Sequence, residues 1–242
     1  MTDPPEETRS SDARRRATRE RFDQIASIYD AQFVRFVDKY QEMLDVMIAH
    51  LRELKPDAES VLDLGLGTGE VSQRVLETLP SARVHGVDFS EKMIEGARTK
   101  LQRHAGRFTW ELADLSGYRP APGRTYDAVV SSITIHHLAD TEKRALVIGV
   151  CGALRKGGIF LNADLARGET ELESRTSLAL HLESLRGRGL DENAIQERLA
   201  RHREHDIPAR LSDQIAWLQE AGCGEIWVPW RHLTQALLIG AR

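Results

Sequence analysis

The chain has 242 residues, of which 41% are hydrophobic and 29% are charged, and its formal net charge is −4. These values suit one large α/β domain with additions. The negative charge argues against nucleic acid as a partner, because nucleic-acid-binding domains are usually basic. The sequence has no apolar run near the roughly 20 residues that span a bilayer and no hydrophobic secretory signal at its N-terminus. We therefore expect a cytoplasmic protein without a membrane partner.

The N-terminal region divides into two parts by composition. Residues 1–16 are charged and contain proline, which predicts a disordered tail. Residues 17–55 place Phe22, Tyr29, Tyr40 and further apolar residues at helical spacing, which predicts two amphipathic helices ending before Pro56.

Short β-type runs alternate with helical runs over the next hundred residues. The pattern predicts strands at 61–64, 83–87, 107–112, 126–131 and 159–163, and helices at 68–79, 91–104 and 140–154. Such alternation is typical of a parallel sheet with helices on both faces.

The C-terminal region breaks this alternation. Three helices are expected at 169–185, 192–204 and 212–220, followed by strands at 226–230 and 233–239. Only Arg231 and His232 separate these two strands. A parallel crossover needs a dozen residues, so the pair must be antiparallel.

A glycine-rich loop follows the first strand, in the segment VLDLGLGTGE at 61–70. Gly65, Gly67 and Gly69 suit backbone that takes positive φ or approaches a ligand closely, and the following helix offers unpaired N–H groups. The loop alone also fits a plain tight turn. A nicotinamide- or flavin-binding fingerprint would need a third glycine at position 70, which is glutamate.

Polar residues follow the next strands. Asp88 lies about 20 residues beyond the loop, where a carboxylate can accept hydrogen bonds from ribose hydroxyls, although it could instead cap the helix at 91. Phe89 could flank an adenine. Asp114 could accept from the adenine amino group or could serve only in a turn. Ser131 and Ser132 end the fourth strand, where ligands of open α/β sheets lie.

Together these strand ends resemble the class I S-adenosylmethionine (SAM)-dependent methyltransferase family, in its small-molecule type 11/25 subgroup, over about residues 17–242. The matching segments are DLGLGTG, VDFSEKM, ADL, SSITIHHL and LRKGG. The resemblance implies a Rossmann-like sheet of seven strands in the order 3-2-1-4-5-7-6, with strand 7 antiparallel. It also implies that residues 17–55 form a helical lid on a SAM-binding domain at 56–242, which includes a helical insert at 166–210.

The resemblance implies SAM as the cofactor. The residues expected to bind it are Tyr29, Tyr40, Asp63, Gly65, Leu66, Gly67, Thr68, Gly69, Asp88, Phe89, Met93, Ala113, Asp114, Leu115, Ser131 and Ser132. Asp63 would orient the loop and the amino end of the methionine, and the two tyrosines would touch the methionine end. Leu66 departs from the small residue or cysteine common in the family, with little expected consequence because backbone makes the contacts there.

His136 is the candidate catalytic base, although His136 and His137 also suit a structural role. Methyl transfer does not require a base, because positioning supplies much of the rate. We expect no metal site, since His202 and His205 lie on a charged, solvated helix.

The expected reaction moves the SAM methyl to a small-molecule nucleophile and releases S-adenosylhomocysteine, in a monomer or a homodimer. Two alternatives stay open. The lid and the C-terminal segment also resemble carboxy-SAM synthase, an enzyme tied to RNA modification. Its carboxylate-reading arginine aligns with Leu199, beside Arg198 and Arg201. The other alternative is a catalytically silent SAM-binding regulator.

Overall fold

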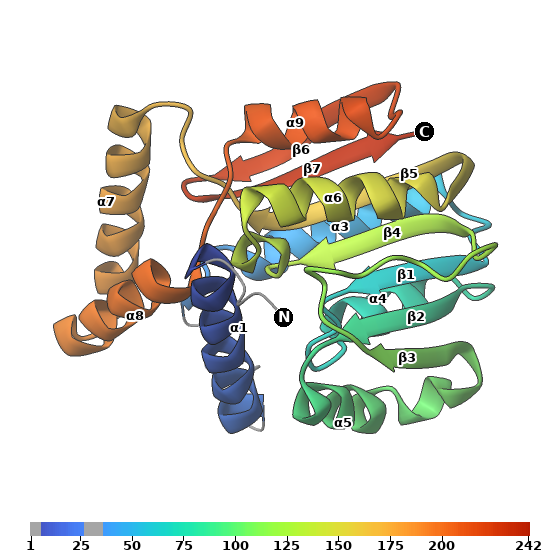
Figure 1. Cartoon of the computed structure of the whole chain (residues 1–242), viewed down its shortest axis with the longest axis horizontal. Helices are drawn as coiled ribbons and strands as arrows, with labels where there is room; N and C mark the ends of the chain where they lie inside the picture. Colours follow the sequence, from blue (N-terminus) through green and yellow to red (C-terminus); the bar gives the residue numbers. More distant parts are fainter. Residues whose placement is uncertain (1–5, 27–35) are drawn as a thin grey trace.

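The computed structural model describes the backbone of residues 6–26 and 36–242, and side chains from residue 16 onward within those ranges. Figure 1 shows one central sheet with helices on both sides. In chain order the elements are α1 (Glu6–Ile25), α3 (Tyr40–Leu54), β1 (Ser60–Leu64), α4 (Glu70–Thr78), β2 (Arg83–Asp88), α5 (Glu91–Lys100), η2 (Gln102–Arg107), β3 (Phe108–Leu112), β4 (Tyr126–Ser132), η3 (Ile135–His137), α6 (Asp140–Gly152), β5 (Leu154–Leu165), α7 (Glu171–Gly187), α8 (Glu192–His205), α9 (Leu211–Glu220), β6 (Glu225–His232) and β7 (Gln235–Ala241).

The sheet has seven strands in the order β3-β2-β1-β4-β5-β7-β6. The first five strands pair in parallel, whereas β7 runs antiparallel to both β5 and β6. The predicted strand order and the antiparallel hairpin at the C-terminus are therefore confirmed.

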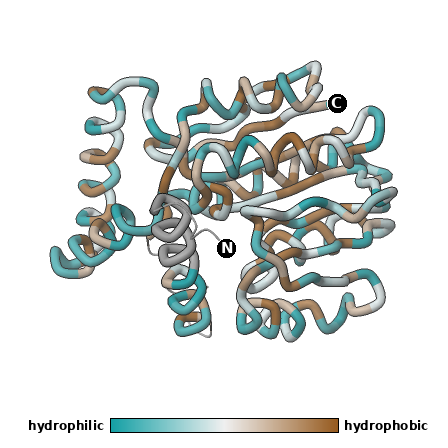
Figure 2. The backbone as a smooth tube through the Cα atoms, viewed as in Figure 1, coloured by the Kyte–Doolittle hydropathy of each residue, from teal (hydrophilic) through white to brown (hydrophobic). Residues whose placement is uncertain are grey.

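The central strands are buried on both faces and appear as apolar bands in Figure 2. Alternate residues of β1 enter two different clusters: Val61 joins the cluster under α3, α4 and α5, and Leu62 joins the cluster under α6 and α9. This two-sided burial is the normal consequence of covering a parallel sheet with helices. The helices cover the two faces of the sheet, so the carboxyl ends of its strands remain open.

Helix α1 begins at Glu6, so the prediction of a disordered tail through residue 16 differs from the structure. That prediction weighed charge and neglected the good helix propensity of the Ala, Arg and Glu residues that fill the segment.

Helix α3 is a core helix. Met43, Leu44, Met47 and Leu51 are completely buried in the larger cluster. Within the described part of residues 17–55, α1 therefore lies outside the core, whereas α3 packs against a face of the sheet.

Helices α7 and α8 form the insert and project beside the sheet (Figure 1). They share a small cluster of their own, made by Leu185, Leu190, Ile195 and Leu199. Among the described residues, none of the helices is both long and apolar enough to span a bilayer.

Candidate functional site

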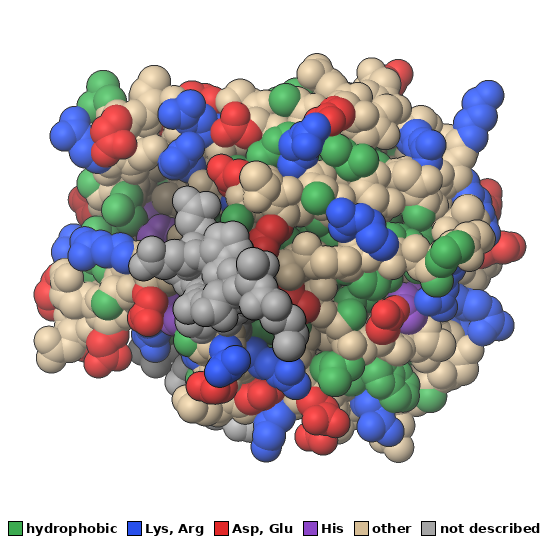
Figure 3. Space-filling model, viewed as in Figure 1, with side chains coloured by type: hydrophobic (Ala, Val, Ile, Leu, Met, Phe, Trp, Pro, Cys, Tyr) green, Lys and Arg blue, Asp and Glu red, His purple; other side chains and the backbone are tan. Residues whose placement is uncertain are grey.

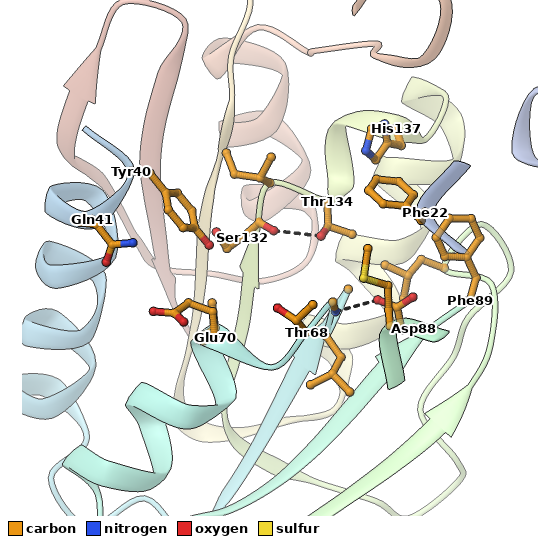
Figure 4. A pocket seen from close by; sticks show the side chains of 17 residues that line it. Phe22, Tyr40, Gln41, Thr68, Glu70, Asp88, Phe89, Ser132, Thr134 and His137 are labelled. Carbon is orange, nitrogen blue, oxygen red and sulfur yellow. Dashed lines mark hydrogen bonds between the residues drawn. The ribbon is translucent and has the colours of Figure 1, made fainter. Parts of the chain in front are cut away.

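Two cavities adjoin each other at the carboxyl ends of the strands. The larger of these two opens at β1, β2 and β4 and spans about 900 Å³, including its open mouth (Figure 4). Ten predicted site residues line it: Tyr40, Gly65, Leu66, Gly67, Thr68, Asp88, Phe89, Met93, Leu115 and Ser132. Seven further residues that were not predicted complete the wall: Phe22, Gln41, Glu70, Val71, Ile133, Thr134 and His137. Of these, Ile133, Thr134 and His137 belong to the segment SSITIHHL. The motif therefore predicted that this segment reaches the site, but not that these side chains line the cavity.

The glycine loop takes the left-handed backbone that its sequence predicted. Gly65, Gly67 and Gly69 have φ angles of 73°, 54° and 87°. A Cβ atom on Gly65 would lie 2.1 Å from Thr134 Cγ2, so this glycine is required for close packing as well as for its φ. Gly69 is the residue that precedes α4, whose N-terminus faces the same edge.

Asp88 ties the second strand to the loop. Its Oδ2 accepts from the Gly67 N–H at 2.8 Å, and its Oδ1 accepts from the Ser90 N–H at 2.9 Å. Each carboxylate oxygen can accept more than one hydrogen bond, so both retain capacity toward the cavity. Burial raises the pKa of Asp88 to about 6, against the lowering effect of these backbone donors. The alternative role of helix cap belongs to Ser90, whose Oγ accepts from the Met93 N–H at 3.1 Å.

Asp63 lies behind the loop and does not line the cavity. Its Oδ2 accepts from Ser72 Oγ at 2.6 Å, and the side chain is 1% exposed. Burial raises the pKa of Asp63 to about 7, and the nearby charge of Asp88 adds to this rise. Its contact with α4 is consistent with holding the start of that helix against β1.

Four other predicted residues also lie away from the cavity wall: Gly69, Ala113, Asp114 and Ser131. Asp114 is exposed, and its Oδ1 accepts from the Ser116 N–H at 2.8 Å, which is the turn role that its sequence position also allowed. Ser131 donates through Oγ to the Leu64 carbonyl at 2.9 Å. Since side chains alternate along a strand, Ser131 and Ser132 could not both face the cavity. Tyr29 lies outside the described residues.

The end of β4 carries local strain. Ile133 has a φ of 46°, which is rare for a β-branched residue. Its N–H donates to the Ala163 carbonyl at 2.9 Å, which holds this backbone in place. Such strain clusters at functional sites, and Ile133 lines both the larger cavity and a second one. Across the cavity, the Tyr40 ring points toward Ser132 (Figure 4).

Helix α1 covers one side of the cavity. The Phe22 ring contacts Phe89 and His137 edge to face, with centroids 5.9 and 5.5 Å apart. Ser90 Oγ donates to Asp23 Oδ1 at 2.6 Å, which joins α1 to the N-terminus of α5. These contacts place Phe22 between the two cavities.

The second cavity lies between α1, η3 and the insert. It is lined by Arg21, Phe22, Ile25, Phe36, Val37, Ile133, His136, His137, Arg198, Arg201 and Asp206. Phe22, Ile133 and His137 also line the larger cavity, so the two spaces share a wall.

His136 lines the second cavity and not the larger one, and it is 2% exposed. Its Nδ1 lies 2.6 Å from Asp164 Oδ1, and its backbone N–H donates to Asp164 Oδ2 at 3.0 Å. Burial alone would lower the pKa of His136, but the charges of Asp164 and Asp206 outweigh it and raise the pKa to about 9. This shift favours the protonated imidazole, which lacks the lone pair of a base.

His137 differs from its neighbour, because burial and the charge of His136 lower its pKa. The prediction that His205 is solvated is wrong: it is 6% exposed, and its Nδ1 lies 3.1 Å from Thr18 Oγ1 of α1. His202 is half-buried and its Nδ1 lies 2.8 Å from Asp206 Oδ2. The C-terminal end of α8 therefore faces α1 and Asp206 rather than solvent, which helical periodicity could not show.

Comparison with known proteins indicates the class of protein to which this site belongs. Residues 61–158 match the family model described as a methyltransferase domain. Carboxy-S-adenosyl-L-methionine synthase of Nautilia profundicola is 23% identical over 86% of this chain and 88% of its own length. Demethylmenaquinone methyltransferase of Leptospira interrogans is 34% identical over 62% of this chain and 60% of its own length.

Solved structures agree in fold. Magnesium protoporphyrin IX methyltransferase of Synechocystis PCC 6803, with bound S-adenosylhomocysteine, superposes with a TM-score of 0.64 at 18% identity, over 94% of this chain and 99% of that one. An O-methyltransferase family protein of Burkholderia thailandensis also gives 0.64, at 19% identity, over 93% and 59% of the two chains.

The domain at residues 61–158 and the strand order together define a class I methyltransferase fold. Residues 61–158 of this chain are a methyltransferase domain, and the chain resembles carboxy-SAM synthase over most of its length.

Proposed function

We propose that SAM occupies the larger cavity, with its ribose hydroxyls on Asp88 and its adenine among Phe89, Met93 and Leu115. Asp88 supports this assignment because its oxygens are oriented by the N–H groups of Gly67 and Ser90 and border the cavity. The methionine end then lies toward Gly65, near Tyr40 and Ser132 (Figure 4). Asp63, Gly69, Ala113, Asp114 and Ser131 act behind or beside this pocket.

The methyl acceptor is a small molecule in the second cavity. The observation that carries this is the shared wall: Phe22, Ile133 and His137 line both cavities. A nucleophile held there attacks the methyl carbon as the carbon–sulfur bond breaks, and S-adenosylhomocysteine leaves. Holding the two reactants in line supplies much of the rate without a base.

The second cavity favours an acceptor that carries a negative charge. Arg21, Arg198 and Arg201 contribute to its lining. Arg198 Nη2 lies 3.7 Å from Asp206 Oδ2, a loose pair that leaves other donors of this guanidinium for a ligand. Arginine is well suited to carboxylates and phosphates, which it binds through two parallel hydrogen bonds.

Helix α1 acts as the lid of both cavities. Its contacts through Phe22, Asp23 and Thr18 reach η3, α5 and α8. A small molecule suits such a covered site better than a polymer. On the face shown in Figure 3, acidic and basic side chains are interspersed instead of gathered into one basic patch, which fits the expectation that nucleic acid is not the partner. Homodimer formation and a cytoplasmic location stay predictions.

The test is a screen of carboxylate-bearing phenols, amines and thiols for release of S-adenosylhomocysteine. We expect turnover with an acidic acceptor, and we expect Arg201→Gln to raise its KM at least about tenfold with little change in SAM affinity. Turnover only with neutral acceptors, or an unchanged KM in the variant, would overturn the assignment of the second cavity.

A carboxy-SAM synthase-like activity is the second candidate. It is favoured by the resemblance to the Nautilia profundicola synthase over 88% of that protein's length. The arginines that line the second cavity, next to the larger one, also favour it. Mass spectrometry of the nucleoside that copurifies with the protein separates the two candidates. Plain SAM or S-adenosylhomocysteine supports methyl transfer, whereas a cofactor with an added carboxylate supports the synthase reaction.

A further inference from the structure

Three side chains able to bind a metal converge on the wall of the second cavity. They are His136 and His137 in η3 and Asp206, which directly follows α8. One ligand atom from each lies within 4.8 Å of the other two. Both histidine side chains and the aspartate line the cavity itself. No metal site was expected from the sequence, in which about seventy positions separate these histidines from Asp206.

The distances within this cluster fit a metal ion better than direct hydrogen bonds. His136 Nε2 lies 3.5 Å from Asp206 Oδ1, and His137 Nδ1 lies 3.3 Å from the same oxygen. A tetrahedral ion with bonds of about 2.0–2.1 Å separates its ligand atoms by about 3.3–3.4 Å. The two edges that meet at Asp206 Oδ1 are therefore close to those of such a polyhedron, and the two imidazole nitrogens lie within 4.8 Å of each other.

Asp206 supplies an independent sign of a missing partner. Its side chain is 1% exposed, and within the described part of the chain Oδ1 receives no hydrogen bond. The other oxygen, Oδ2, is occupied by His202 Nδ1 at 2.8 Å. A buried carboxylate oxygen without a donor is costly and calls for an explanation. This oxygen points between two imidazole nitrogens, where a cation would satisfy it.

Asp164 provides the outer support that histidine ligands usually have. It accepts from His136 Nδ1 at 2.6 Å, which leaves Nε2 directed to the cluster. A carboxylate on the far nitrogen fixes the ring orientation and raises the basicity of the ligating nitrogen. Asp164 is itself fixed by the N–H groups of His136 and Leu165. For His137, Nδ1 also lies 3.2 Å from the His205 carbonyl, a contact that a metal ion would replace.

We propose that His136, His137 and Asp206 bind one divalent transition-metal ion, with its remaining coordination position open to the second cavity. Imidazole nitrogens suit zinc or ferrous iron, whereas magnesium prefers a site made of oxygens. An open position is typical of a catalytic rather than a structural ion. It would bind an oxygen of the acceptor and favour its anionic form. Metal binding rests on the geometry alone, and only this catalytic use rests on the proposed function.

A simpler arrangement would have a proton on His136 shared between Asp164 and Asp206, with no metal. Metal content distinguishes the two. The full chain is stripped with a chelator, incubated separately with Zn²⁺, Co²⁺ or, without oxygen, Fe²⁺, desalted, and analysed by mass spectrometry for metal. We expect about one ion per chain in the wild type and in His104→Gln, a histidine control on η2 at the other edge of the molecule.

Asp206→Asn and His137→Gln should each weaken metal affinity at least about tenfold. Loading with Co²⁺ should give visible absorption bands that are lost in both variants. The thermal melting curve shows whether each variant is folded, and SAM affinity is a further check for Asp206→Asn, since Asp206 does not line the larger cavity. Sub-stoichiometric metal in the wild type for all three ions would overturn the proposal, as would undiminished binding in folded Asp206→Asn and His137→Gln. Neither readout needs an acceptor, so a negative result leaves the methyl-transfer proposal standing.

Discussion

The two cavities differ in how the chain builds them. The larger cavity comes mainly from segments at the carboxyl ends of strands, at 65–71, 88–93 and 132–137, which the parallel pairing brings to one end of the sheet. The second cavity joins η3 to α1 and to α8, and its contacts cross long stretches of chain, as between Thr18 and His205. Local motifs therefore specify the cofactor site, whereas tertiary packing of the insert specifies the acceptor site.

The largest effect is expected at Gly65. Alanine there would need a φ of 73° and would bring Cβ within 2.1 Å of Thr134 Cγ2. The strained φ alone costs about 1–3 kcal/mol, and the clash displaces the loop from the cofactor. We expect Gly65→Ala to abolish measurable SAM binding in titration calorimetry.

Gly67→Ala is the matched control, because its φ is also positive but a Cβ would meet only the Gly65 carbonyl at 4.0 Å. It should retain weakened binding. Adding Thr134→Gly to Gly65→Ala should restore part of the affinity, because it also removes the Thr134 Cβ that would lie 2.5 Å from the new Cβ. Wild-type SAM affinity in Gly65→Ala would show that close packing against Thr134 does not determine the shape of this loop.

The next effect compares two carboxylates that the sequence placed in the same site. Asp88→Ala removes acceptors for ribose and releases the Gly67 N–H, whereas Asp114 is exposed in a turn. Hydrogen bonds to charged groups contribute about 1.5–3 kcal/mol each. We therefore expect Asp88→Ala to weaken SAM about a hundredfold and Asp114→Ala to change it less than about twofold. A comparable loss in both variants would mean that the loop carrying Asp114 moves into the pocket when SAM binds.

The sequence predicted much of the fold because its determinants are local. Alternating apolar runs set the strands, and a two-residue connection forced the antiparallel hairpin of β6 and β7. The same reasoning failed where orientation matters: it assigned both Ser131 and Ser132 to the cavity, although a strand alternates. It also missed Phe22 and Asp206, since periodicity shows that a helix has an apolar or polar face but not what that face covers.

A smaller effect is expected from the cover formed by α1. Phe22 contacts Phe89 and His137 and belongs to both cavities. An aromatic pair contributes about 0.5–1.5 kcal/mol beyond its buried area. Phe22→Ala should weaken SAM about tenfold and lower kcat, while Phe22→Leu should retain most of the affinity. Unchanged SAM affinity and turnover in Phe22→Ala would show that α1 does not contribute to the site.

The smallest effect concerns the pH dependence of SAM binding. It distinguishes the larger cavity from the cluster of His136, His137 and Asp206. Burial raises the pKa of Asp88 to about 6, so its charge is lost as the pH falls through that value. Ribose hydroxyls are donors that favour the charged carboxylate. For a single group with this pKa, SAM affinity should fall about fourfold from pH 7.5 to pH 5.5.

Asp88→Asn should bind SAM weakly at both pH values and show no such fall, because its amide does not titrate. His136→Asn should keep the wild-type fall, since His136 does not line the larger cavity. A profile that follows His136 instead of Asp88 would show that the two cavities are coupled electrostatically across their shared wall.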